Sequence, residues 1–323
     1  MTFNKIFIKI SVGFQNQERM WGMAYKSRTK SSQLLILKSL NIRMNLSDNE
    51  SQQYFNLEKG YEGEGIFDTF TEKLRCECLI LNDLLLKMNG SLFQIDSLII
   101  TSEAIYFYEV KNYEGDYYYE SDKIYKNPKF EIINPINQLN RSESLLRQLL
   151  HSLGFNLPIN ASVVFINPEF TLYQSPLNKP FIFPTQVHRY LNKLNKISLK
   201  LNEKHKMLAD KLVELHIEDS PFQQLPPYDY DQLRKGMTCV KCDSFAISVQ
   251  GHKCICKGCG HKELAETTIM QSVEELKLLF PNQKITTNLI YDWCKVVKSK
   301  KRIRRILEKN YKKVGVHQWS FYQ

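Results

Sequence analysis

The fold is decided by residues 94–111, which read Gln-Ile-Asp-Ser-Leu-Ile-Ile-Thr-Ser-Glu-Ala-Ile-Tyr-Phe-Tyr-Glu-Val-Lys. Two runs rich in Ile, Tyr and Phe flank a short polar turn at 101–104, which predicts two adjacent β-strands. Glu109 and Lys111 are two residues apart, so on a strand their side chains project to the same side. Asp96 lies on the preceding strand and can reach that side across the pair.

These charged residues stand inside apolar strands, where a charge is costly unless it is paired or binds a metal. A salt bridge between Glu109 and Lys111 on a solvated face is the simpler interpretation of the pair alone. The acid at Asp96, an acidic helix before it and a helix bearing Gln138 after it favour a functional site instead.

Four separated motifs occur in an order that resembles the nuclease-related domain (NERD), a family placed in the PD-(D/E)xK nuclease superfamily. They are Gly-Tyr-Glu-Gly-Glu at 60–64, Gln-Ile-Asp at 94–96, Glu-Val-Lys-Asn at 109–112, and Asn-Pro at 134–135 followed by Gln138. The resemblance covers roughly residues 55–170. It implies a restriction-endonuclease-like α/β fold, in which a mixed central sheet is flanked by helices.

The resemblance also implies a metal-dependent phosphodiesterase. Asp96 and Glu109, with the backbone carbonyl of Val110, would bind Mg²⁺ or Mn²⁺, because oxygen ligands suit these ions. Lys111 would orient the attacking water or stabilise the charge that develops on the phosphate. The catalytic set that the resemblance implies is Glu64, Asp96, Glu109, Lys111 and Gln138, with Arg141 as a weaker candidate for a phosphate contact.

The segments around these motifs are predicted as follows. A helix runs from Ser47 to Leu57, and a glycine-rich lead at 60–65 opens a second helix that continues to about Leu74. The lead lacks the Lys-Ser/Thr ending of a phosphate-binding loop, so nucleotide binding is excluded there. An acid at the start of a helix interacts favourably with the dipole in any case. The resemblance favours Glu64 as a carboxylate that is aimed at the metal site of the sheet. Residues 76–87 alternate in hydropathy and predict the first strand.

Cysteine spacing gives a second strong signal. Cys239-Val-Lys-Cys242 and Cys256-Lys-Gly-Cys259 are two C-x₂-C pairs separated by 13 residues. Four thiolates in this pattern predict a structural Zn²⁺ site, and the folding of so small a module depends on the metal. A redox C-x-x-C pair is the alternative, and the two pairs in series make it the weaker one. Cys254 is a surplus thiol, and His252 and His261 are substitute ligands.

The last part of the chain is predicted to be helical and basic. One helix follows Thr286 and Thr287, and a second covers 300–311. These helices and a closing segment at 318–322 suit a helix-turn-helix or winged-helix variant, or equally a helical cap with a solvated basic face. The predicted nucleic-acid contacts are Lys298, Lys300, Lys301, Arg302, Arg304 and Arg305.

Charge and composition agree with a protein that grips an acidic polymer. Residues 1–45 carry 8 Lys and Arg against 1 acid, and residues 284–323 carry 11 against 2, in a chain of net charge +10. Basic ends around an acidic centre predict a nucleic-acid partner, with DNA as the preferred one. Eight cysteines without a convincing secretion signal favour a cytoplasmic, reducing compartment and metal binding. No apolar run reaches about 18 residues, so no membrane helix is expected.

The expected organisation is therefore a nuclease-like domain, a zinc ribbon and a basic helical domain, and a homodimer is left open. The predicted ranges are 1–22 (disordered, or ahead of the true start), 23–59 (helical segment), 60–218 (nuclease-like domain), 219–235 (linker), 236–266 (zinc ribbon) and 267–323 (basic helical domain). Two other functions stay open: a catalytically silent nucleic-acid-binding module, and a zinc-ribbon regulator that uses the nuclease fold as a scaffold.

Overall fold

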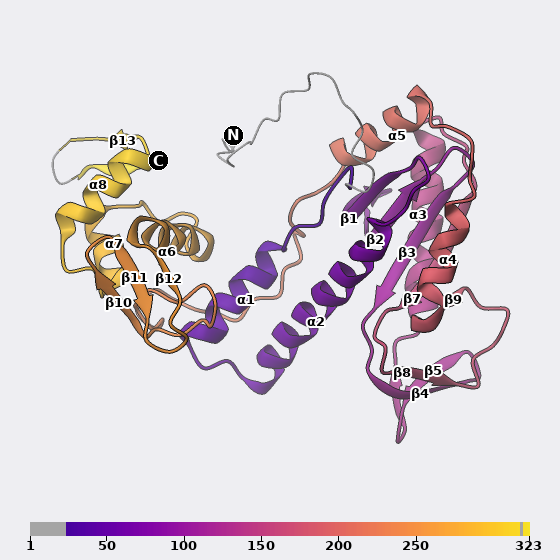
Figure 1. The fold of residues 1–323 in the computed structure, drawn as a ribbon, viewed down its shortest axis with the longest axis horizontal. Helices are drawn as coiled ribbons and strands as arrows, with labels where there is room; N and C mark the ends of the chain where they lie inside the picture. Colours follow the sequence, from indigo (N-terminus) through magenta and orange to yellow (C-terminus); the bar gives the residue numbers. More distant parts are fainter. Residues whose placement is uncertain (1–23, 317–318) are drawn as a thin grey trace. The chain divides into compact units, whose positions relative to one another are not determined.

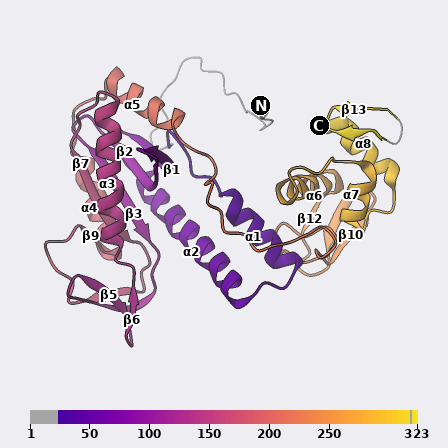
Figure 2. The same ribbon diagram turned by 180° about the vertical axis from the view of Figure 1, so that it is seen from behind.

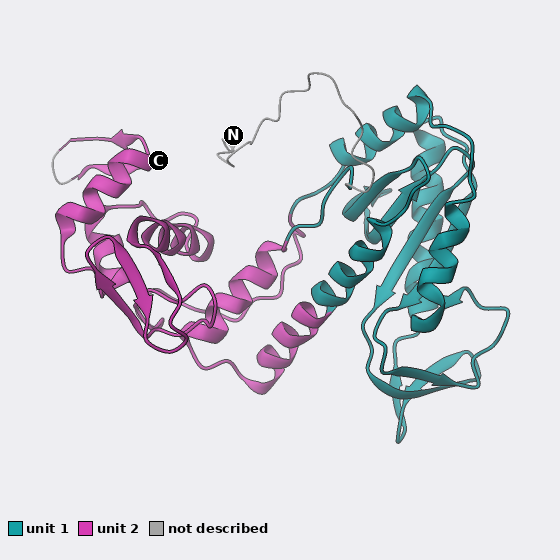
Figure 3. Ribbon diagram, viewed as in Figure 1, with its two compact units in different colours: residues 1–29, 60–218 teal, residues 30–59, 219–323 magenta. Residues whose placement is uncertain are grey.

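The computed structural model describes residues 24–316 and 319–323, so the expectation for residues 1–22 lies outside the described part. The chain divides into two compact units that interleave along the sequence. Unit 1 holds residues 1–29 and 60–218, and unit 2 holds residues 30–59 and 219–323 (Figure 3).

Unit 1 is built on a five-stranded mixed sheet in the order β1-β2-β3-β7-β9. β1, β2 and β3 pair antiparallel, whereas β3, β7 and β9 pair parallel. The predicted α/β class with a mixed sheet and flanking helices is therefore confirmed. The strands are β1 (Leu79–Met88), β2 (Ser91–Ile100), β3 (Ile105–Lys111), β7 (Ile159–Phe165) and β9 (Phe181–Ile182).

Helices cover both faces of this sheet (Figures 1 and 2). On one face α3 (Pro135–Ser152) and α5 (Glu203–Glu214) bury leucines against Phe107 and Leu98. On the other face α4 (Val187–Leu194), after the 3-10 turn η1 (Pro184–Gln186), packs with Phe67 against Tyr108. Alternate residues of β3 thus point into two different cores, as the period of a strand requires.

The helix before the first strand is longer than expected. α2 (Asp48–Thr71) runs without a break through the segment predicted as a glycine-rich lead, so the prediction of two helices is wrong. Glycine in a helix interior costs only about 1 kcal/mol relative to alanine, which the neighbouring turns can absorb. The first strand begins at Leu79, three residues after the predicted Cys76, and Cys76 is a buried core thiol.

A second, smaller sheet of unit 1 has the order β6-β5-β4-β8. Tyr117 and Tyr119 point into the core, which supports packing as the role of these tyrosines. Tyr118 lies on the other face and stacks on Tyr125 with ring centroids 5.1 Å apart. The strands are β4 (Gly115–Glu120), β5 (Lys123–Lys126), β6 (Phe130–Ile132) and β8 (Phe170–Tyr173).

Unit 2 has one hydrophobic core, to which an N-terminal helix, a three-stranded antiparallel sheet and the C-terminal helices all contribute. Arg43, at the end of α1, is 2% exposed and forms an ion pair with Glu275 of α6. The elements are α1 (Ser32–Arg43), β10 (Ile247–Gln250), β11 (Lys253–Cys256), β12 (Lys262–Leu264), α6 (Ala265–Leu279), α7 (Thr287–Cys294), α8 (Lys300–Asn310), β13 (Lys313–Val314) and β14 (Phe321–Tyr322). Among the described residues, no helix is both long and apolar enough to span a membrane.

Candidate active site and metal centre

The site in unit 1 lies where β2 and β3 part. Their paired register ends at Ser97 opposite Tyr108, and β3 then continues beside β7 alone. Beyond this point the Asp96 side chain supplies the acceptor that a paired strand would otherwise provide. Its Oδ2 accepts a hydrogen bond of 2.8 Å from the backbone N–H of Val110. Asp96 is 5% exposed, so its carboxylate is fixed between the two strands.

Glu109 and Lys111 lie at the end of β3, on either side of Val110, and their side chains project to the same side of the strand. The Lys111 ammonium lies 2.7 Å from Oε1 of Glu109 and donates a 3.2 Å hydrogen bond to Oε1 of Gln138. Gln138 lies in the first turn of α3, which Asn134 caps through its side chain. The structure therefore brings these three predicted residues together.

The Glu109 carboxylate is the unusual member of the group. Glu109 is 1% exposed, and neither of its oxygens accepts a directed hydrogen bond from the described residues. Its close cationic partner is the Lys111 ammonium, which lies beside Oε1. A buried carboxylate oxygen without a donor is costly, and a metal ion is one of the few partners that would satisfy it.

Glu64 reaches the same region from α2, and a basic residue holds it there. Its Oε2 contacts a terminal nitrogen of Arg28. The Arg28 guanidinium also binds both oxygens of Asp68, at 2.9 and 3.0 Å, and donates to the backbone carbonyl of Asp96 at 2.8 Å. Glu64 is therefore tied to the strand that carries Asp96.

The close approach of α2 to β3 depends on a glycine. A Cβ built on Gly63 would lie 2.9 Å from Cγ of Asn112 and closer still to its Cβ. Real Cβ atoms do not come so near, so only glycine fits at this turn of the helix. Glu64 follows directly, which explains how a helix residue comes within reach of a carboxylate on the sheet.

Burial and crowding of like charges dominate the electrostatics. Burial, followed by the negative charge of Asp96, raises the pKa of Glu64 to about 9 and that of Glu109 to about 7. Burial also raises the pKa of Asp96, against the effects of Lys111 and the Val110 N–H. Burial opposes the charge of Lys111, but Glu109 and Asp96 outweigh it and raise the pKa of that ammonium. Without a metal these carboxyl groups therefore hold protons more readily than usual, and a divalent cation would take the place of those protons.

The three carboxylates are neighbours without forming a ready-made cage. Among the described residues, only the cysteine cluster has three or more ligand atoms within 4.8 Å of one another. Oxygen donors fit Mg²⁺ or Mn²⁺, and Asp96 and Glu109 are the pair with buried oxygens to offer. Arg141 is exposed and donates to the Leu92 carbonyl at 3.2 Å, and its role as a phosphate contact stays a prediction.

Arg28 and Asp68 were missed by the sequence prediction. Arg28 lies in a stretch without regular structure ahead of α1, where no spacing connects it to the motifs. Asp68 follows Glu64 by four residues, so both lie on one face of α2. This pair of acids on one helix face is the signal in the sequence that indicates a cation shared by Glu64 and Asp68.

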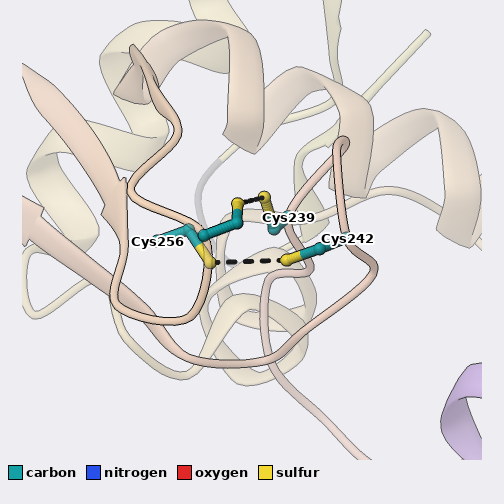
Figure 4. Close-up of side chains that lie close together, drawn as sticks. Cys239, Cys242 and Cys256 are labelled. Atoms are coloured by element: carbon teal, nitrogen blue, oxygen red, sulfur yellow. Dashed lines mark hydrogen bonds between the residues drawn. The ribbon is translucent and has the colours of Figure 1, made fainter.

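The cysteine centre in unit 2 has the geometry of a structural zinc site. Its four thiols have sulfur atoms within 4.8 Å of one another, and the pairs Cys239–Cys259 and Cys242–Cys256 are each 3.6 Å apart (Figure 4). Tetrahedral Zn²⁺ with bonds of about 2.3 Å places its sulfurs about 3.8 Å apart. The predicted set is therefore confirmed as a cluster that could bind zinc.

Backbone groups support the thiolate form of this cluster. An N–H of Cys259, followed by that of Gly258, lowers the pKa of Cys256 to about 7, although partial burial opposes the shift. Gly260 has φ +72° and donates to the Cys256 carbonyl at 3.0 Å, which closes the knuckle turn. Cys254 and His261 lie outside the cluster.

The basic residues on and before α8 are mostly exposed. Lys298, Lys300, Lys301, Arg304 and Arg305 are exposed, and Arg302 is half-buried. Arg304 pairs with Glu308, and Lys300 donates to Asn288. Lys298, Lys301 and Arg305 form no ion pair within the described ranges. Ser299 caps the helix, whose buried face is Ile303, Ile306 and Leu307.

Comparison with known proteins gives a family match for the stretch that contains the first candidate site. A family model described as the nuclease-related domain (NERD) matches residues 59–166. The match begins within α2, ends just after β7, and contains Glu64, Asp96, Glu109, Lys111 and Gln138. The resemblance drawn from the motifs is thereby confirmed for this stretch. A search of curated proteins and a search of solved structures found no match to the chain.

Proposed function

We propose that the chain is a divalent-metal-dependent nuclease that hydrolyses phosphodiester bonds, preferably in DNA. The match to the nuclease-related domain supports a nuclease-related activity for residues 59–166. The observation that carries the proposal further is the Glu109 carboxylate, which is buried and has the Lys111 ammonium, 2.7 Å from Oε1, as its close cationic partner. An arrangement of this kind is destabilising in a purely structural role.

In this proposal Asp96, Glu109 and the Val110 carbonyl would hold Mg²⁺ or Mn²⁺, which supplies Lewis-acid activation of the scissile phosphate when bound. The Lys111 ammonium would donate a hydrogen bond to the attacking water, or stabilise the negative charge that develops on the phosphate. Gln138 accepts from that nitrogen and so fixes its direction. Glu64 supplies a further carboxylate from α2.

The cysteine cluster and the basic residues of α8 would serve binding. A closed Cys₄ site leaves no open coordination position, so its zinc would stabilise the ribbon and take no part in cleavage. The exposed cations Lys298, Lys301 and Arg305 are placed on one segment and would contact phosphates. Affinity that depends on such contacts falls steeply with salt.

The test is cleavage of a panel of single- and double-stranded DNA and RNA at low salt with Mg²⁺ or Mn²⁺. Wild type is compared with Glu109→Gln and Lys111→Met, and with Lys123→Met as a control. Lys123 is exposed and pairs with Glu131 on the second sheet, away from the candidate site. The proposal predicts cleavage by wild type and the control, and none by the two site variants.

Three results would contradict the proposal. Binding of nucleic acid by wild type without cleavage, in the presence of either ion, would favour the silent binding module. Cleavage that survives both site variants would mean that the activity lies elsewhere. Sequence-specific duplex binding that survives Glu109→Gln but is lost with residues 239–323 would favour the zinc-ribbon regulator.

A further inference from the structure

The segment ahead of α1 is attached to the sheet of unit 1 beside the candidate site. Lys26 forms a parallel bridge with Leu81, in which its N–H donates to the Ile80 carbonyl at 3.1 Å and its carbonyl accepts from Asn82 at 2.9 Å. This short pairing fixes residues 26–28 along the outer edge of β1. Two cations, Lys26 and Arg28, are thereby placed next to the point where β1 and β2 bend.

The bend has a recognisable cause. Asp83 has φ +55°, and the register pairs Asn82 with Ser97 and Leu84 with Ile95, so that Asp83 and Asp96 face one another without a ladder pair. Before the bend, odd-numbered residues of β1 such as Leu81 point into the main core. After the bend, even-numbered residues such as Leu84 do so. An irregularity of this type re-aims side chains, and here it presents Asp96 to the Val110 N–H.

Lys26 stabilises the backbone of the bend. Its ammonium donates to the carbonyls of Asn82 and Asp83, at 2.9 and 2.7 Å, and takes up carbonyl groups that the irregular ladder leaves open. It has no ion pair with the candidate catalytic carboxylates within the described residues. Lys26 therefore acts on the backbone of the bend that presents Asp96.

Arg28 makes contacts of another kind. Its side chain is 4% exposed, and three carboxylate oxygens and one carbonyl surround the guanidinium. Asp68 accepts from Arg28 through both carboxylate oxygens, and this bidentate pairing fixes the plane of the guanidinium. The remaining donors then join the Glu64 carboxylate on α2 to the Asp96 backbone on β2.

We propose that Arg28 is a positioning residue of the metal site, which orients the Glu64 carboxylate toward Asp96 and Glu109. The inference rests on the proposed function, since it assigns Arg28 a part in that same site. Hydrogen bonds to a ligating carboxylate from residues behind it orient the ligand, and their loss typically lowers metal affinity by about 10- to 100-fold. Lysine would not replace Arg28, because an ammonium cannot bind Asp68, Glu64 and the Asp96 carbonyl in one plane.

The test is Mn²⁺ binding by isothermal titration calorimetry, with the full chain supplied with Zn²⁺ during expression. The variants are Arg28→Met, Arg28→Lys, Glu64→Gln and the double variant Arg28→Met/Glu64→Gln, with Leu212→Ala in the core under α5 as control and Glu109→Gln as reference. Arg28→Met should weaken Mn²⁺ binding by about 10- to 100-fold, and Arg28→Lys should restore little of it. The double variant should bind no more weakly than Glu64→Gln, because Arg28 acts through Glu64 and has no further effect once that carboxylate is gone.

The control separates positioning from general loss of structure. Leu212→Ala, which leaves a cavity in the core, should lower the melting temperature and leave Mn²⁺ affinity within about twofold of wild type. Unchanged or tighter binding in Arg28→Met, or a further loss in the double variant relative to Glu64→Gln, would overturn the inference. If Glu109→Gln abolishes Mn²⁺ binding while Arg28→Met leaves it intact, only the role of Arg28 fails. If wild type has no Mn²⁺ site that depends on Glu109, the proposed function and the role of Arg28 fail together.

Discussion

Gly63 of α2 lies against Asn112 at the end of β3, so closely that any side chain on the glycine would overlap the asparagine. Gly60 and Gly65 of the same helix have open space around the position of a Cβ. The three glycines therefore have different roles. Gly63 sets the distance between helix and sheet, and so the reach of Glu64, whereas the other two do not meet a neighbour.

This difference gives the first prediction. Gly63→Ala should destabilise unit 1 by about 1–3 kcal/mol, since overpacking forces the helix away from the strand. Gly65→Ala should stabilise it by about 0.5–1 kcal/mol, because alanine is the better helix former and meets no obstacle. Urea unfolding of both variants measures the two values. Equal effects of the two substitutions would show that the contact with Asn112 does not restrict the helix.

The residues that carry the chemistry of both sites can be predicted from the sequence more readily than the residues that surround them. Residues 94–111 predict the strands and the carboxylates because alternation and apolar runs are local signals. Cysteine spacing is equally local. Arg28 could not be predicted, because its role depends on a bridge between Lys26 and Leu81 that joins residues far apart in sequence.

The sequence also did not predict that α2 is one continuous helix. Three glycines within residues 60–65 are typical of a loop, and only the contact with Asn112 shows why one of them lies in a helix. The interleaving of the two units has the same cause. Residues 30–59 contain no marker that assigns them to the unit with residues 219–323, since that assignment depends on tertiary contacts such as Arg43 with Glu275.

Glu109→Gln should increase the stability of the metal-free protein while removing metal binding. The substitution keeps the shape of the side chain and removes a buried charge, whose cost the Lys111 ion pair only partly offsets, because burial and the charge of Asp96 still raise the pKa of Glu109. Thermal unfolding in the presence of a chelator at pH 8 should show a higher melting temperature than wild type. Added Mn²⁺ should raise the melting temperature of wild type only. A lower melting temperature of the metal-free variant would mean that the Lys111 ion pair outweighs the cost of burial.

His216 should make the stability of unit 1 depend on pH. Burial, followed by the charge of Lys26, lowers the pKa of His216, whose Nδ1 accepts a 3.0 Å hydrogen bond from the Leu85 N–H. A histidine with a lowered pKa binds fewer protons in the folded state. Its contribution is therefore present above the unfolded pKa of about 6.5 and is lost as the pH falls through the folded value.

The measurement is the melting temperature of wild type and His216→Asn between pH 5 and 8. Asparagine retains an acceptor and does not titrate, so the variant should lose less stability than wild type on acidification. His252→Asn serves as the control, because His252 is exposed. An identical pH dependence of wild type and His216→Asn would exclude His216 as the source.

Arg43 should be the most sensitive charged residue of unit 2. It donates to Glu275 at 2.8 Å and to the carbonyls of Arg234 and Gly236, at 2.7 and 3.1 Å, and it lies 4.1 Å from the ring centroid of Trp293. Arg43→Leu should destabilise unit 2 by about 3–5 kcal/mol, since it breaks a buried pair and leaves Glu275 without its partner.

The matched control for Arg43 is Arg304→Leu, which breaks an exposed pair with Glu308. Exposed pairs contribute about 0–1 kcal/mol, so this variant should unfold close to wild type. Chemical unfolding followed by the fluorescence of Trp293 reports on unit 2 directly, because that side chain is buried in its core. Similar losses in both variants would mean that Arg43 acts as a surface charge.

Cysteine substitution should separate the metal ligands from the other thiols. Cys239→Ser should reduce bound zinc from about one ion per chain to almost none and unfold the ribbon, because all four thiolates are needed to close the site. Cys78→Ser lies in unit 1, outside the cluster, and should retain the zinc. Metal analysis of the purified variants gives the stoichiometry, and a chelator added to wild type should reproduce the loss of structure seen with Cys239→Ser. Zinc retained by Cys239→Ser, with loss in Cys78→Ser, would place the metal elsewhere than in the four-cysteine cluster.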